Sequence, residues 1–103
     1  MILASVAFLV AGKDAAALTA SEISENMSSD EQVAYISGVV EGLAFARWMA
    51  DDRDAAGSQC IWDWFLHSDQ TARINAQMDW FEQNPDQQVS TLMYALIREE
   101  CGE

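Results

Sequence analysis

An uncharged apolar run at the amino terminus decides how much of this 103-residue chain can form a domain. Residues 1–12 read MILASVAFLVAG, which is shorter than the roughly 20 apolar residues that cross a bilayer. Two small-residue triplets follow, Ala15–Ala17 and Leu18–Ala20, and either one fits a cleavage site of the A-x-A kind. The pattern predicts a secretory signal peptide over residues 1–20 and a single mature domain over residues 21–103.

The predicted signal peptide lacks its basic n-region, because no Lys or Arg precedes the apolar run. A start codon assigned downstream of the true one would explain this. Two alternatives remain open at this point, a buried amino-terminal helix and a membrane anchor. A signal peptide would place the mature chain in the periplasm.

The mature domain has two cysteines, Cys60 and Cys101. A domain of this size buries only about 60% of its unfolded surface, so an exported one usually needs a disulfide. One intramolecular bridge would stabilise the fold by about 4 kcal/mol in the chain-entropy estimate. Free buried thiols and an intermolecular bridge are the alternatives.

Helical periodicity dominates the mature chain, and strand signals are weak. The predicted fold is all-α, a small bundle of about four helices over residues 21–27, 30–49, 69–83 and 87–100. Thr19 with Glu22, and Ser28 with Glu31, fit capping boxes at the first two helix starts. A Cys60–Cys101 bridge would tie together the open ends of the last helical hairpin.

Other parts of the pattern give more local predictions. Residues 51–59 (DDRDAAGSQ) are expected to form a loop, and residues 60–65 one helical turn. Ser68 is the expected cap of the third helix, whose predicted inward residues are Ile74, Met78 and Phe81. The second helix carries a stripe of small residues, on which we expect another segment to pack closely: Ala34, Gly38, Gly42, Ala46 and Ala50.

The net charge of −12 excludes nucleic acid as a partner, since phosphate binding needs basic patches. It also argues against anionic membrane surfaces. An acidic surface steers basic proteins toward itself, although excess acid also simply keeps a small exported protein soluble.

The sequence predicts no enzyme, no cofactor and no metal site. The only histidine is His67, and no catalytic partner set accompanies it. Asp52, Asp54, Gly57 and Asp63 match four positions of a calcium-binding EF loop. Position five of that loop is Ala56, which offers no side-chain oxygen, so calcium is disfavoured.

The candidate partner-binding residues lie in an acidic loop and an adjacent aromatic segment. Tryptophan is enriched at binding hot spots because one rigid side chain buries a large area. The alternative for the tryptophans, including Trp48 and Trp80, is that they fill the core. The predicted patch comprises Asp51, Asp52, Asp54, Trp62, Asp63 and Trp64.

Four features along the chain form a recognisable order. These are a signal peptide; the helix Tyr35-Ile36-Ser37-Gly38-Val39-Val40-Glu41-Gly42-Leu43; the pair Cys60-Ile61; and Trp80-Phe81-x-x-Asn84-Pro85-Asp86 followed by Ala95-Leu96 and Cys101. The order resembles that of the Rap/Tai family of type VI secretion immunity proteins. The chain differs from the family pattern at Trp62 and Glu100, where the family has proline.

The resemblance implies a small periplasmic helical protein, often a homodimer. It also implies that the protein inhibits a peptidoglycan-cutting effector by binding to it. An acid-stress periplasmic chaperone of the Hde type is the alternative expectation, because such chaperones are also small, helical, exported and singly bridged.

Overall fold

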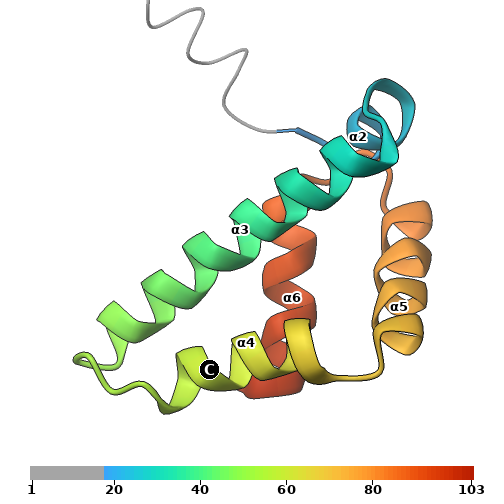
Figure 1. The fold of residues 1–103 in the computed structure, drawn as a ribbon. Helices are drawn as coiled ribbons and strands as arrows, with labels where there is room; N and C mark the ends of the chain where they lie inside the picture. Colours follow the sequence, from blue (N-terminus) through green and yellow to red (C-terminus); the bar gives the residue numbers. More distant parts are fainter. Residues whose placement is uncertain (1–17) are drawn as a thin grey trace, which may run out of the picture.

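The computed structural model describes residues 18–103, and most of the predicted signal peptide lies outside these residues. The described chain forms five helices (Figure 1): α2 (Ala20–Asn26), α3 (Ser29–Ala50), α4 (Ala56–His67), α5 (Gln70–Gln83) and α6 (Val89–Cys101). The all-α prediction is confirmed, with one helix more than the predicted four. None of these helices is long and apolar enough to cross a membrane.

Both predicted capping boxes are present and set the starts of α2 and α3. The Glu22 amide donates to Thr19 Oγ1 at 3.2 Å, and the Thr19 amide donates to Glu22 Oε1 at 3.0 Å. Ser28 and Glu31 repeat this exchange before α3. Each box satisfies amides that a helix start otherwise leaves unpaired.

Helix α6 lies at the centre of the fold and contacts α3, α4 and α5 (Figure 1). It contributes four buried residues, Val89, Leu92, Met93 and Ile97, which recur at helical spacing. They join a single core whose largest fully buried side chains from other helices are Ile23, Val40 and Ile61.

The predicted Cys60–Cys101 disulfide is present, with the two Cα atoms 5.8 Å apart. Cys60 lies inside α4, and Cys101 is the last residue of α6. The bridge therefore joins two packed helices rather than the open ends of the α5–α6 hairpin.

The region between α3 and α5 differs from the prediction. Residues 56–59, expected in a loop, begin the twelve-residue helix α4. Ser68 ends α4 by donating its hydroxyl to the Trp64 carbonyl, so it does not cap α5. The α5 cap is Asp69, whose carboxylate accepts from the Ala72 amide at 3.2 Å.

The inward face of α5 is also corrected. Phe81 is buried as predicted, but Ile74 and Met78 are 47% and 42% exposed. Gln77 is buried in their place. The helix contacts α2, α4 and α6, and this arrangement turns the Ile74 and Met78 side toward solvent.

The small-residue stripe of α3 is exposed, which contradicts the predicted close packing. A Cβ atom added at Gly38 or Gly42 would meet no described atom within 4 Å. The stripe faces away from the core side of α3, where Val40 and Ala44 are buried.

We therefore expect Gly38→Ala and Gly42→Ala each to raise the free energy of unfolding by up to about 1 kcal/mol, the helix-propensity difference. Urea denaturation measures the change. The control is Gly57→Ala, because a Cβ atom there would lie 2.7 Å from Arg47 Cζ and from Asp51 Oδ2. A loss of stability in Gly38→Ala would show that this face is covered.

Candidate interaction surface at the corner between α3 and α4

The turn between α3 and α4 is held by backbone contacts to the last turn of α3. The Arg53 amide donates to the Trp48 carbonyl at 2.8 Å, and the Asp54 amide to the Asp51 carbonyl at 3.0 Å. Asp52 and Arg53 have φ angles of 55° and 68°, in the left-handed region. That conformation costs about 1–2 kcal/mol per non-glycine residue, so the surrounding contacts hold the turn in this shape.

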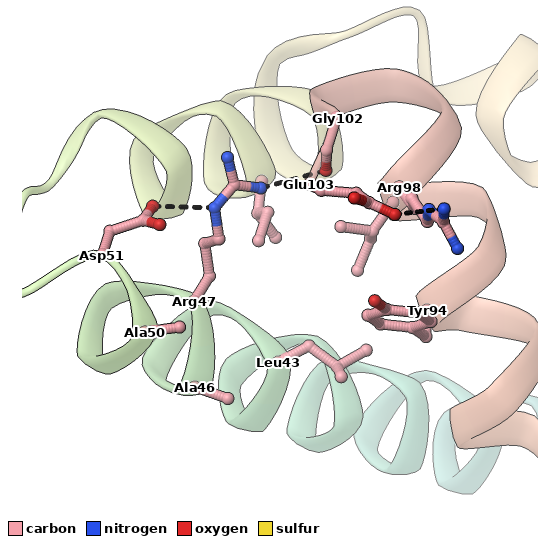
Figure 2. A pocket seen from close by; sticks show the side chains of 11 residues that line it. Leu43, Ala46, Arg47, Ala50, Asp51, Tyr94, Arg98, Gly102 and Glu103 are labelled. Atoms are coloured by element: carbon pink, nitrogen blue, oxygen red, sulfur yellow. Dashed lines mark hydrogen bonds and ion pairs between the residues drawn. The ribbon is translucent and has the colours of Figure 1, made fainter.

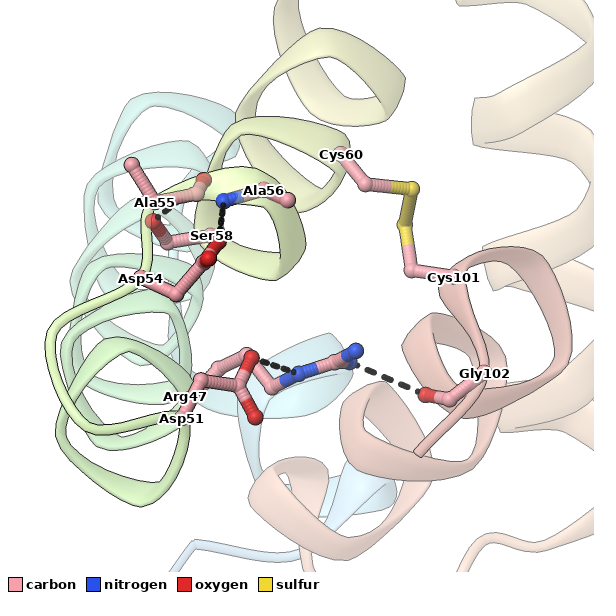
Figure 3. Close-up of polar contacts among 9 residues, drawn as sticks. All are labelled: Arg47, Asp51, Asp54, Ala55, Ala56, Ser58, Cys60, Cys101 and Gly102. Atoms are coloured by element: carbon pink, nitrogen blue, oxygen red, sulfur yellow. Dashed lines mark hydrogen bonds and ion pairs between the residues drawn. A yellow bond between two sulfur atoms is a disulfide. The ribbon is translucent and has the colours of Figure 1, made fainter.

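Asp51, a predicted partner-binding residue, is engaged inside the protein. Its Oδ2 accepts from Arg47 Nε at 2.7 Å, and Arg47 Nη1 donates to the Gly102 carbonyl at 3.1 Å (Figure 3). Arg47 thus connects the end of α3 to the end of α6. Gly57 is buried against this pair, which leaves no room for a side chain there.

The other two acidic residues of the turn differ in their roles. Asp54 accepts from the Ala56 amide at 2.8 Å and so fixes the start of α4 (Figure 3). Asp52 is exposed, and no hydrogen bond or ion pair joins its side chain to another residue within 18–103. Of the three acidic residues of this turn, Asp52 is the one whose side chain is free to meet a partner.

A mainly apolar pocket of about 260 Å³ lies between α3, α4 and α6 beside this turn (Figure 2). Leu43 of α3 and Tyr94 of α6 face each other across it, and Arg47 lies at one end. Arg98 pairs with the Glu103 carboxylate at its edge. Both arginines are neutralised by carboxylates, so the pocket has no unpaired charge among its described lining residues.

Trp62 and Trp64 do not form one patch. Residues two apart on a helix point in different directions, and each tryptophan lines a different hollow. Trp64 lies on the side of α4 that carries Cys60 and His67. Asp63 is exposed and lines the Trp64 hollow, so it does not join the two rings.

Trp62 belongs to a hollow between α3 and α4, here called the aromatic hollow, which is lined by Glu41, Ala44, Phe45, Trp48, Ser58 and Trp62. Phe45 is 61% exposed, and its ring centroid lies 5.9 Å from that of Trp48. Trp48 and Trp62 are both half-buried. Trp62 also packs on the core, as do Trp64 and Trp80, so these three have the core role that the sequence left open. The aromatic hollow and the Asp52 turn share the last turn of α3.

Phe45 is the aromatic residue of this surface that the sequence did not indicate as a candidate. Val40 and Ala44 mark the buried face of α3, and helical geometry places Phe45 away from that face. The sequence indicated Gly57 only as a position of an EF loop, and not as the residue that packs against Arg47 and Asp51. Since Gly57 and Asp63 both lie within α4, no EF loop forms, and no group of three or more His, Cys, Asp or Glu residues within 18–103 could hold a metal ion.

Comparison with known proteins identifies no relative: no family model, no curated protein and no solved structure matches the chain.

Proposed function

We propose that this protein is a periplasmic, immunity-type binding protein that inhibits a cell-wall-degrading effector. The observation that carries the proposal is the aromatic hollow, with Phe45 exposed near the end of α3, not far from the Asp52 turn. Exposed aromatic side chains grouped with polar neighbours are typical of interaction sites. The order of short motifs that resembles the Rap/Tai family supports the choice of partner.

The partner that fits this surface has an apolar projection surrounded by basic residues. Phe45, Trp48 and Trp62 offer rigid ring faces to an apolar side chain. Glu41 lines the hollow and Asp52 lies in the adjoining turn, and both are exposed. The net charge of −12 would accelerate encounter with such a basic surface at low salt.

If the chain is exported, cleavage at the two candidate sites would leave two different amino-terminal residues. Of the two candidate cleavage sites, only a cut after Ala17 keeps residues 18–20, which belong to the folded domain. The Leu18 carbonyl accepts from the Val89 amide at 2.9 Å, Thr19 caps α2, and Ala20 is buried. We expect the exported chain to begin at Leu18, as read by intact mass and amino-terminal sequencing of periplasmic protein. A chain that begins at Ser21, or one that stays uncut in the cytoplasm, would contradict this.

The binding site is tested by truncating the aromatic hollow. The double variant Phe45→Ala/Trp62→Ala should weaken binding to a captured cell-wall hydrolase by at least about 100-fold, because hot-spot aromatics each contribute about 2 kcal/mol or more. The control is Leu66→Ala, which removes an exposed apolar side chain from the same helix as Trp62. Biolayer interferometry at fixed salt gives the affinities, and equal binding by all three proteins would exclude the hollow.

An acid-stress chaperone is a second proposal, and the start of α3 is one place where acid would weaken the fold. Hydrogen bonds from the Ser28 amide and hydroxyl lower the pKa of Glu31. A carboxyl with a depressed folded pKa stabilises the fold above its unfolded pKa, and this contribution is lost as the pH falls through the folded value. Acid-induced binding of a hydrophobic dye, together with suppression of client aggregation, would support this second function over the first.

A further inference from the structure

A second hollow, separate from the aromatic hollow, lies where α3 and α5 diverge. Figure 1 shows α5 on the far side of α6 from most of α3. The groove between them has a volume of about 210 Å³. Val33 lines it from α3, Ile74 and Met78 from α5, and Phe65 of α4 and Gln77 lie at its base; all three rim residues are exposed.

The base of this groove holds donors without acceptors. Gln77 is only 4% exposed, and its Nε2 has no hydrogen-bond partner within residues 18–103. Arg73 Nε is buried and unpartnered in the same part of the chain. The Arg73 guanidinium lies 4.4 Å from the centre of the Phe65 ring, and its burial lowers the pKa of Arg73. Buried donors are almost always paired in folded proteins, with protein groups or ordered water, so these two donors are available to an acceptor that enters the groove.

The spacing of the two residues along α5 matches that of an extended backbone. Arg73 and Gln77 are four residues apart on one helix, which places their Cα atoms about 6 Å apart along the axis. Carbonyls on one side of an extended strand repeat every two residues, or about 6.6 Å. Within a helical partner the carbonyls are already bonded to its own amides, except in its last turn, so a helix fits these two donors less well than an extended segment.

The charge of the groove fits the same occupant. Its described lining carries Arg73 and no carboxylate, in a chain whose net charge is −12. No carboxylate of this lining therefore repels the partly negative oxygen of a main-chain carbonyl, and Arg73 attracts it. The exposed Val33, Ile74 and Met78 would cover alternate apolar side chains of such a strand.

We propose that this groove binds an extended apolar peptide segment of a partner protein, with main-chain carbonyls accepting from Arg73 and Gln77. The inference does not depend on the proposed function, because the groove and the aromatic hollow share no lining residue.

The test uses the full chain with its disulfide intact and a phage library of random heptapeptides as the probe. We expect enrichment of sequences with apolar residues at alternate positions. Fluorescence polarisation with the strongest selected peptide should then show at least tenfold weaker binding to Gln77→Leu. Binding to Gln83→Leu, an exposed glutamine on the same helix, should stay unchanged.

A second readout separates this role from a purely structural one. Gln77→Leu removes the unpaired buried donor, so the free protein should melt at a higher temperature while the peptide binds less well. Phe45→Ala/Trp62→Ala should bind the peptide normally. Failure to enrich any peptide, equal binding by Gln77→Leu, or a self-dimer that Gln77→Leu dissociates would overturn the proposal.

Discussion

Replacing Cys60 and Cys101 together by serine is expected to lower the free energy of unfolding by about 4 kcal/mol. The two residues are 41 positions apart, and a loop of that length gives this value in the chain-entropy estimate. Small domains have a total stability of only about 5–15 kcal/mol, so this variant loses a large share of it. Urea denaturation of both proteins, fitted with a common slope, measures the difference.

The same substitution should also loosen the corner between α3 and α4. The bridge fixes the end of α6, and the adjacent Gly102 carbonyl accepts from Arg47, which holds Asp51. Wild-type protein reduced with dithiothreitol is the control and should match the double-serine variant. A loss below about 1 kcal/mol in both would mean that the bridge does not restrain the unfolded chain.

Ile61→Ala is expected to lower the free energy of unfolding by about 2–5 kcal/mol, the usual range for large-to-alanine changes in a core. Ile61 is 1% exposed and lies next to Cys60 in α4, where it packs in the core and also lines the pocket beside Arg47. The substitution leaves a cavity between the core side chains and those that line the pocket.

The matched control for Ile61→Ala is Leu66→Ala, because Leu66 is on the same helix but 50% exposed. Its truncation should change the free energy of unfolding by much less, since fewer contacts and less buried area are lost. Similar losses in the two variants would mean that α4 does not pack on the core through its Ile61 side.

The helix starts were predictable where side chains cap the backbone. Thr19 and Ser28 identify the beginnings of α2 and α3, because a hydroxyl followed three residues later by a glutamate is a local signal. The α6 face was predictable from its period. Helix α4 was not, because its start depends on Asp54 within an acidic stretch that is typical of a loop, and Ala55 gives no side-chain cap.

The buried faces of α3 and α5 were predicted wrongly because tertiary packing decides which side of a helix is covered. Ile74 and Met78 have the spacing of a buried stripe, but α5 turns Gln77 and Phe81 inward instead. In α5, unlike α6, the spacing of the apolar residues did not reveal which side of the helix its neighbours cover. Likewise, two glycines four residues apart are compatible with close packing and with an open surface. In α3 the surface around Gly38 and Gly42 is open.

For the candidate site, the sequence predicted most of the residues but not how they are arranged. Neighbours in sequence were expected to act together, yet helix geometry separates Trp62 from Trp64, and internal hydrogen bonds engage Asp51 and Asp54. Phe45 and Trp62 line one hollow because α3 and α4 pack at this corner. That arrangement depends on the turn at Asp52 and Arg53, which the sequence does not specify.

The most direct test of the proposed inhibitor function is affinity capture from periplasmic extract with the bridged chain, followed by mass spectrometry and a peptidoglycan-digestion assay. The account predicts one cell-wall hydrolase recovered in equimolar amount, whose release of labelled peptidoglycan fragments stops when the protein is added. Recovery of no hydrolase, or of one that digests peptidoglycan at an unchanged rate in the presence of excess protein, would contradict it.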